Sequence, residues 1–315
     1  MPTKLTDKDK QAIEDWTRKI EIDPNDAEAY YERGDLYKRN SDYPKAIEDW
    51  TRVIEIDPDN ARAYRERGYS YYHLRKYAKG IEDYTRMIEI DPNNTDAYEW
   101  RACLYRSLDD YPKAIADLTR AIEIDPDDPD LYNDRADSYA DLGDYQKAIA
   151  DYTRAIELDT NEVGQFMHHH YRGRVYAALG DHLKAIADWT RANELDPYDT
   201  PTYHCRGESY MALRDYANAA ADFTRAIDRG PKGNEFFYHC RGRAYGRLGF
   251  HAKAIEDFTK AIEIDPDDEL TYDDRGRAYE KLGDLKNATL DARKACELGS
   301  CELLEYMDKN GKICD

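Results

Sequence analysis

Residues 27–60 read AEAYYERGDLYKRNSDYPKAIEDWTRVIEIDPDN, and most of the chain repeats this stretch with substitutions. The chain has 315 residues, so it has room for eight copies of this 34-residue unit. A fixed period of this length predicts a helical repeat protein in which each unit packs against its neighbours. The later copies start at Ala61, Thr95, Pro129, Phe166, Thr200, Glu235 and Glu269.

Each unit has the pattern of two amphipathic helices. Counted from Ala27 as position 1, apolar or small residues recur at positions 4, 8 and 11 and again at positions 20, 24 and 27. Both triplets have the i, i+4, i+7 spacing of one helical face. Four copies carry Gly at position 15 and six carry Asp at position 16, as in Gly143 and Asp144, which would end one helix and cap the next. A proline at position 32, such as Pro58, ends the second helix.

These positions resemble those of the tetratricopeptide repeat family: an aromatic residue at 4, Gly or Ala at 8, Tyr at 11, Ala at 20, an aromatic residue at 24, Ala at 27 and Pro at 32. The resemblance covers residues 11–302 and implies an all-α fold, a right-handed α-solenoid superhelix of stacked antiparallel helix pairs. Departures from the pattern include His169 at position 4, Gly80 at position 20, Thr160 and Ser300 at position 32, and Lys19, Val53 and Met87 at position 27.

The repeats set the expected domain organisation. Residues 1–26 would form a polar lead-in and an N-terminal half repeat, with residues 11–26 matching the second helix of a unit. Residues 303–315 would form a C-terminal capping helix. Extra residues at 163–165 and at Asn234 interrupt the register and predict a local change of shape. Between the caps, one solenoid domain over 27–302 would consist of repeats 27–60, 61–94, 95–128, 129–162, 166–199, 200–233, 235–268 and 269–302.

Composition excludes several classes of function. The net charge of −20 argues against nucleic acid or an anionic membrane as the main partner, because phosphate binding needs a basic surface. Neither a bilayer-spanning apolar segment nor a signal peptide is apparent, which predicts a cytoplasmic protein, or a periplasmic or extracellular one if a leader has been removed. The sequence has no Gly-rich phosphate loop, no zinc-protease motif and no nucleophile elbow. We therefore expect no enzyme activity and no cofactor.

Two charged columns recur in every copy, arginine at position 7 on the first helix and aspartate at position 23 on the second. Guanidinium and carboxylate groups form forked ion pairs, so we predict an Arg–Asp pair within each hairpin or between neighbours. The alternative is a row of arginines that binds a polyanion. The arginines are Arg33, Arg67, Arg101, Arg135, Arg172, Arg206, Arg241 and Arg275, and the aspartates are Asp49, Asp83, Asp117, Asp151, Asp188, Asp222, Asp257 and Asp291.

The family resemblance also implies where a partner would bind. In that family the first helices line a concave surface, and positions 2, 5, 9, 12 and 13 commonly contact a peptide. Carried over to this chain, these positions form bands of charge that could fix the register of a peptide. Repeats one and two give the basic and aromatic residues Lys38, Arg39, Arg62, Arg65, Tyr69, Tyr72 and His73, and repeats three and four give Asp96, Glu99, Asp130, Asp137 and Asp141. Repeats five to eight give His170, Arg174, His204, His239, Arg243, Arg247, Arg277 and Lys281.

The sequence thus predicts a non-catalytic scaffold that binds a protein or peptide in a groove, with an acidic or carboxylate-ended segment preferred at repeats five to eight. Ordinary solvated charges are the plainer interpretation of any single member of these bands. A self-assembling structural protein, associating through the ends of the solenoid, is one alternative. A metal- or redox-responsive regulator is another, because His170, His204 and His239 share position 5, and Cys205 and Cys240 share position 6.

Geometry argues against metal binding by these columns. Equivalent residues on neighbouring helices stand roughly 8–10 Å apart, and adjacent residues on one helix point in directions about 100° apart. We therefore expect no metal site there. Near the C-terminus, an oxidising compartment would favour a bridge from Cys314 to Cys301 or Cys296, whereas a reducing one would leave thiols.

Overall fold

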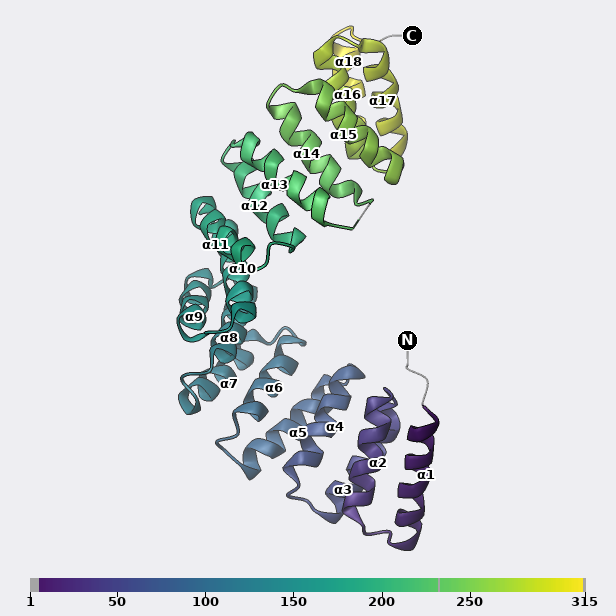
Figure 1. Ribbon diagram of the computed structural model, residues 1–315, viewed down its shortest axis with the longest axis vertical. Helices are drawn as coiled ribbons and strands as arrows, with labels where there is room; N and C mark the ends of the chain where they lie inside the picture. Colours follow the sequence, from purple (N-terminus) through teal and green to yellow (C-terminus); the bar gives the residue numbers. More distant parts are fainter. Residues whose placement is uncertain (1–5, 232, 314–315) are drawn as a thin grey trace. The chain divides into compact units, whose positions relative to one another are not determined.

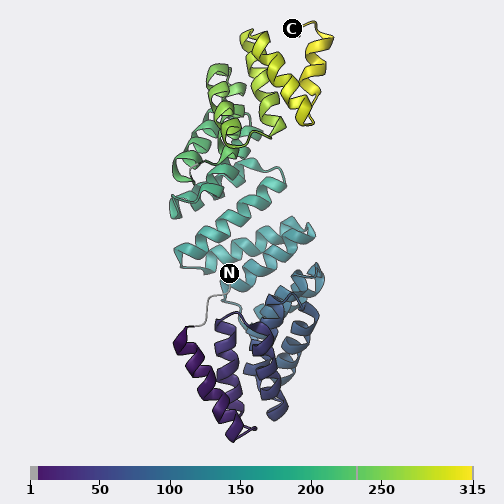
Figure 2. The same cartoon turned by 90° about the vertical axis from the view of Figure 1, so that its right-hand side faces the viewer.

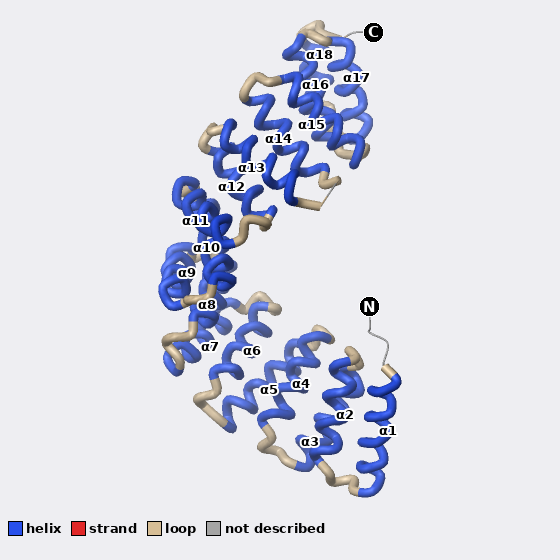
Figure 3. Tube along the Cα trace, in the orientation of Figure 1, coloured by secondary structure: helices blue, strands red, loops and turns tan. Residues whose placement is uncertain are grey.

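The structure, a computed structural model, describes residues 6–231 and 233–313. Every regular element in these two ranges is an α-helix, and no strand occurs in them (Figure 3). The helices are α1 (Asp7–Ile22), α2 (Ala27–Arg39), α3 (Tyr43–Ile56), α4 (Ala61–His73), α5 (Tyr77–Ile90), α6 (Thr95–Arg106), α7 (Tyr111–Ile124), α8 (Pro129–Leu142), α9 (Tyr145–Leu158), α10 (Glu162–Ala178), α11 (His182–Leu195), α12 (Thr200–Ala212), α13 (Tyr216–Arg229), α14 (Glu235–Arg247), α15 (His251–Ile264), α16 (Glu269–Leu282), α17 (Leu285–Leu298) and α18 (Glu302–Lys309).

The helices group into two compact units. The first unit ends at Asp159 and contains α1 to α9, and the second begins at Thr160 and contains α10 to α18. Within each unit, the two helices of a repeat pack as a hairpin and the hairpins stack in chain order (Figures 1 and 2). The expected all-α fold of stacked helix pairs is therefore confirmed. A single solenoid domain over 27–302 stays a prediction.

The helix ends follow from short polar side chains at the caps. Asn60, at position 34, accepts a hydrogen bond from the backbone N–H of Ala63 and so caps α4. The predicted turn inside the repeat is also present: Gly143 has a φ of +86°, and the Asp144 side chain accepts from the N–H of Lys147. Four repeats have no glycine at position 15, and a larger residue adopts the left-handed conformation there: Ser41, Arg75, Asp109 and Arg214.

In five of the eight hairpins, an aromatic ring at position 24 packs on a glycine at position 8. A Cβ atom added to Gly207 would lie 2.6 Å from the ring of Phe223, and one added to Gly34 would lie 3.0 Å from the ring of Trp50. Both rings are fully buried. Position 8 therefore needs a small residue because the ring at position 24 occupies the space that a side chain would fill.

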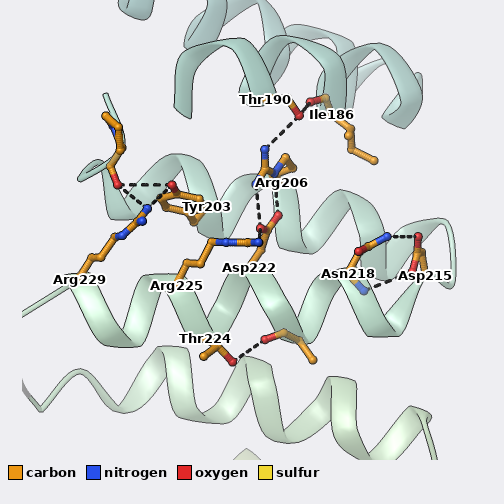
Figure 4. A network of polar contacts seen from close by, with 12 residues as sticks. Ile186, Thr190, Tyr203, Arg206, Asp215, Asn218, Asp222, Thr224, Arg225 and Arg229 are labelled. Carbon is orange, nitrogen blue, oxygen red and sulfur yellow. Dashed lines mark hydrogen bonds and ion pairs between the residues drawn. The ribbon is translucent and has the colours of Figure 1, made fainter. Parts of the chain in front are cut away.

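The predicted Arg–Asp pairs occur in all eight hairpins, and Figure 4 shows one of them. Arg206 donates from Nε and Nη2 to the two carboxylate oxygens of Asp222, at 2.7 and 2.8 Å. The other seven arginines make the same forked contact with the aspartate of their own repeat. The guanidinium groups are thus engaged inside the hairpins, which argues against a row of arginines that binds a polyanion.

A threonine links seven of these pairs to the preceding helix pair or half repeat, a contact that the repeat pattern did not predict. The third nitrogen of Arg206, Nη1, donates to Thr190 Oγ1 at 3.0 Å, and Thr190 donates to the carbonyl of Ile186 at 2.7 Å (Figure 4). Equivalent bonds start from Arg33, Arg67, Arg101, Arg135, Arg241 and Arg275. The only sequence signal was the recurrence of threonine at position 25.

Two helices begin earlier than the repeat alignment predicts. α1 starts at Asp7 rather than Gln11, because Thr6 and Asp9 form a capping box. Residues 1–5 of the expected lead-in lie outside the described residues. α10 starts at Glu162, where Asn161 caps it, so the extra residues 163–165 lengthen this helix at its N-terminus.

The last helix covers the end of the last repeat. Leu303 and Met307 of α18 are buried against α16 and α17, in a cluster that also contains Ala288 and Ala292. Leu303 takes the place of the aromatic ring over Gly276, since a Cβ at that glycine would lie 2.6 Å from it. The C-terminal cap expected over 303–315 is a helix only from Glu302 to Lys309, and residues 314 and 315 lie outside the described residues.

Candidate functional site

Basic side chains of α14 and α16 converge on one cavity in the second unit. The cavity has a volume of about 410 Å³. Four of the predicted site residues line it, two from position 9 and two from position 13 of repeats seven and eight. The lining residues are Arg243, Gly246, Arg247, His251, Phe258, Asp274, Arg277, Ala278 and Lys281.

The cations of this cavity differ in how far their charge is neutralised. Arg277 donates to Asp273 at 2.6 Å, and Lys281 lies 3.4 Å from Glu280. Arg243 and Arg247 are exposed, and within residues 6–231 and 233–313 no carboxylate lies within ion-pair distance of either. Both also line a neighbouring cavity of about 450 Å³, together with Glu208, Met211, Ala212, Arg214 and Tyr216. These two arginines are therefore the accessible, uncompensated positive charges of the site.

Two of the predicted site histidines are held by contacts inside the second unit. The Nδ1 atom of His170 lies 2.6 Å from Thr202 Oγ1. His239 contacts Thr271 Oγ1 through Nδ1 at 2.7 Å and Asp274 through Nε2 at 3.0 Å. Burial lowers the pKa of His170. Neither ring lines the two cavities described above, and Arg174, which stacks over Tyr171, does not line them either.

His204 belongs to a different group of side chains. One ring nitrogen of His204, a carboxylate oxygen of Glu208 and the sulfur of Cys240 all lie within 4.8 Å of one another. The Nε2 atom of His204 is buried, and no residue in the described part of the chain forms a hydrogen bond with it. Burial lowers the pKa of His204 and raises the pKa of Cys240 to about 12. The repeat pattern does not indicate this group, because its three residues come from different positions of the repeat, 5, 9 and 6.

The predicted basic patch of the first unit is largely neutralised. Lys38 lies 2.6 Å from Glu66, and Arg65 lies 3.0 Å from the same carboxylate. Arg39 lies 2.9 Å from Asp35. These cations help to line a cavity of about 370 Å³ whose lining residues are Lys38, Arg39, Tyr43, Arg65, Glu66, Tyr69, Tyr84 and Trp100.

The aromatic site residues of the first unit pack against one another. The ring centroids of Tyr69 and Tyr72 lie 5.3 and 6.0 Å from that of Trp100. Arg62 stacks on Tyr31, with the guanidinium carbon 3.8 Å from the ring centroid. This geometry is that of a packed aromatic cluster with a cation–π contact at its side.

Repeats three and four gather carboxylates, as the sequence predicts. Burial raises the pKa of Glu99 to about 7 and that of Asp134 to about 6. The negative charges of neighbouring aspartates also raise the pKa of both carboxyls. Arg106 compensates part of this charge, since it lies 3.1 Å from Asp137 and 3.5 Å from Asp141. Asp134 was not among the predicted acidic residues, although it lies on the same helix as Asp137.

The C-terminal cysteines pair differently from the prediction. Cys296 and Cys301 form a disulfide across the turn between α17 and α18, with their Cα atoms 4.1 Å apart. The predicted bridge from either of them to Cys314 is therefore wrong for the two cysteines that are described, because they bond to each other. Cys314 lies outside the described residues. Cys103, Cys205 and Cys240 are free thiols.

Among the described residues, no helix combines the length and the apolar character needed to cross a bilayer.

The fold and its recurring contacts define an α-helical repeat protein. Comparison with family models shows which kind of helical repeat it contains. Tetratricopeptide repeat models match residues 20–48, 35–104, 101–163, 133–200, 236–268 and 271–298. The chain belongs to the tetratricopeptide repeat family. Proteins of this family generally mediate protein–protein interactions and are typically non-catalytic. No curated protein matches the sequence.

Solved structures of tetratricopeptide repeat proteins share the fold. The C-terminal part of one such protein from Cytophaga hutchinsonii has a TM-score of 0.65 and 18% identity, and the match covers 78% of this chain and 98% of that one. A second, from Parabacteroides merdae, has a TM-score of 0.58 and 20% identity, with 80% and 98% covered. YrrB, a tetratricopeptide repeat protein with an unusual peptide-binding site, has a TM-score of 0.51 and 24% identity, with 61% and 96% covered.

Proposed function

We propose that this protein is a non-catalytic scaffold whose second unit binds an acidic segment of a partner protein in the cavity between α14 and α16. The observation that carries the proposal is the convergence of Arg243, Arg247, Arg277 and Lys281 on one cavity. The family generally mediates protein–protein interactions, and YrrB is a relative in fold with a peptide-binding site.

The charge balance of the cavity supports an anionic ligand. The whole chain carries a net charge of −20, so two exposed arginines without an ion-paired carboxylate are unusual for it. Arg243 and Arg247 have no such carboxylate among the described residues, whereas the cations of the first-unit patch share Glu66. A carboxylate that enters the second-unit cavity would meet forked donors that need not first leave an existing partner.

The cavity also has an apolar side suited to a peptide. Phe258 and Ala278 contribute lining surface next to the cations. Charged groups would fix the orientation and register of the ligand, and the apolar surface would add affinity. We infer that an acidic side chain or a C-terminal carboxylate sits among the arginines, with an apolar neighbour against Phe258.

A labelled peptide tests this proposal. We expect an acidic peptide rich in Asp and Glu, with a free C-terminus, to bind with an affinity that falls as salt is added. The double variant Arg243→Glu/Arg247→Glu should weaken binding at least ~10-fold, since it replaces two attractive charges by repulsive ones. Fluorescence anisotropy at several salt concentrations measures both effects.

A matched variant controls for net charge. Arg293 is exposed on α17 and does not line the cavities described above. Arg293→Glu should therefore leave binding of the same peptide nearly unchanged. Equal weakening by Arg293→Glu and by the cavity variant, or binding of a lysine-rich peptide in place of the acidic one, would remove the cavity as the site.

A further inference from the structure

A second kind of site lies beside this cavity. The structure assigns a divalent transition-metal site of the zinc type to His204, Glu208 and Cys240, formed by two residues of α12 and one of α14. This site goes beyond the proposed peptide binding and does not depend on it. Imidazole nitrogen, carboxylate oxygen and thiolate sulfur are the three donor types that zinc takes in proteins.

The positions of the three residues bring their donor atoms together. His204 and Glu208 are four residues apart on α12, so they share one helical face. Cys240 belongs to the first helix of the next repeat and supplies the third donor, and all three atoms lie within 4.8 Å of one another. Donors at 2.0–2.3 Å from one zinc ion stand roughly 3.3–3.8 Å apart in a tetrahedron. Side-chain rotations that move each donor atom by about 1 Å would therefore bring all three within bonding distance of one ion.

The unsatisfied nitrogen of His204 is an independent sign of a ligand. Its Nε2 atom is buried and has no hydrogen-bond partner within the described residues. Nearly all buried polar side-chain atoms have a partner, because leaving one without a partner costs free energy. A bound metal ion would satisfy this nitrogen.

The surroundings of the group suit a metal that is held firmly. The His204 ring packs beside Phe236, Phe223 and Phe237, with centroid separations of 4.8, 6.0 and 6.1 Å. Cys240 is only 3% exposed. An apolar shell of this kind restricts water and fixes the orientation of the ligands. Glu208 also lines the cavity of about 450 Å³, which gives an ion a path to the group and leaves room for a water molecule as fourth ligand.

Charge and proton balance can be written for the binding step. The divalent ion bonds to the His204 nitrogen, the Glu208 carboxylate and the Cys240 sulfur, and the thiol releases its proton to solvent. Carboxylate and thiolate together carry two negative charges, which neutralise the ion. The bound site is then electrically neutral, and the positive charge of Arg243 acts on Cys240 from nearby. Because a proton is released, affinity should rise with pH.

Cobalt titration of the full-length chain, purified without a polyhistidine tag, tests the site. Co²⁺ should bind with one equivalent and produce the visible bands of a four-coordinate ion and a near-ultraviolet thiolate-to-metal band. Zn²⁺ should then abolish both bands at one equivalent. Absence of the thiolate band in the wild-type chain would overturn the proposal.

Variants identify the ligands. Cys240→Ser should abolish the thiolate band, and Glu208→Gln, which keeps the size of the side chain, should weaken Zn²⁺ binding at least ~10-fold. Cys205→Ser is the matched control, because Cys205 is a free thiol on α12 next to His204. It should keep the band.

A stability measurement keeps the test valid if Cys240→Ser folds poorly. Zn²⁺ should raise the melting temperature of the wild-type chain and of Cys205→Ser. It should raise that of Glu208→Gln less, since ligand stabilisation of the folded state grows with the logarithm of the binding affinity. A thiolate band that survives in Cys240→Ser, or disappears in Cys205→Ser, would contradict the assignment. So would equal Zn²⁺ stabilisation of the wild-type chain and Glu208→Gln.

Discussion

The two units use the same repeat, but the most conspicuous charged group on their first helices is acidic in one unit and basic in the other. In the first unit, Glu99 and Asp134 lie half-buried among further aspartates, and burial raises the pKa of both. In the second unit, Arg243 and Arg247 lie exposed beside a cavity. Both units keep the same Arg–Asp fork inside each hairpin. The comparison shows that charges inside the hairpin hold the fold, whereas charges on the first helices are free to differ.

The largest difference between the units should appear when one fork arginine is removed from each. Arg67→Met in the first unit leaves the buried carboxylate of Asp83 without its cation, and loss of one partner of a buried pair costs about 3–5 kcal/mol. Arg206→Met in the second unit should cost less, because Arg225 Nη1 also lies 2.7 Å from Asp222. Hydrogen exchange of α4–α5 and of α12–α13 amides measures the local free energy of opening in each unit.

A pH series and a double variant check this explanation. Burial already raises the pKa of Asp83 with Arg67 present, so the carboxyl of the Arg67→Met variant should take up a proton at still higher pH. Its loss of stability should therefore shrink as pH falls through that folded-state pKa. Arg67→Met/Asp83→Leu should recover part of the stability at neutral pH. Equal losses for Arg67→Met and Arg206→Met would contradict the role given to Arg225.

The carboxylates of the first unit predict a pH dependence of its stability. The pKa of Glu99 is raised to about 7 from an ordinary value of 4.5, and that of Asp134 to about 6 from 3.8. Between the unfolded and folded pKa values the folded state holds protons that the unfolded chain has released. Stability of α6–α8 should therefore fall as pH rises from about 4 to about 7, by roughly 1–2 kcal/mol, given partial exposure to solvent.

Neutral variants separate this effect from general acid sensitivity. Glu99→Gln and Asp134→Asn should raise the stability of the first unit above pH 7 and flatten its pH profile. Glu82→Gln, at an exposed position of α5, should leave the profile as it is. Hydrogen exchange in the second unit serves as an internal reference. If stability depends on pH as steeply in Glu99→Gln and in Asp134→Asn as in the wild-type chain, other groups cause the pH dependence.

The periodicity of the sequence predicted contacts between two recurring, complementary residues, but it did not predict contacts that depend on the surrounding structure. The fork between Arg206 and Asp222 could be predicted, because both residues recur and their side chains are complementary. The bond from Arg206 to Thr190 could not be predicted, since a threonine within a helix can satisfy its hydroxyl on the carbonyl four residues earlier, as Thr190 does on Ile186. Helix starts were missed where a local cap, such as Thr6, extends a helix beyond the repeat.

The candidate site was predicted only in part for the same reason. Arg243, Arg247, Arg277 and Lys281 share positions 9 and 13, and the structure does bring them to one cavity. His170 and His239 share position 5, but threonines of the following repeat engage their rings. The group of His204, Glu208 and Cys240 combines three different positions, so only coordinates show that it converges.

The smallest expected effect concerns the turns inside the repeats. At position 15 the first unit has Ser41, Arg75 and Asp109 with positive φ, whereas the second has glycine in three of its four repeats and Arg214 in the other. A non-glycine residue pays about 1 kcal/mol or more for this conformation. Arg75→Gly should therefore stabilise α4–α5 by about 0.5–1 kcal/mol, the gain being reduced by the extra freedom of glycine in the unfolded chain.

The reverse substitution in the second unit measures the free-energy cost of the left-handed backbone conformation alone. A Cβ added at Gly249 would have no atom within 4 Å, so Gly249→Arg tests only the cost of a φ of +81°. It should lower the stability of α14–α15 by about 1 kcal/mol. Lys79→Gly, inside α5, is the control for the general destabilising effect of a glycine in this hairpin, and it should cost about 1 kcal/mol. If Arg75→Gly destabilises the hairpin as Lys79→Gly does, its turn is not strained, and the contrast between the units at position 15 has no energetic meaning.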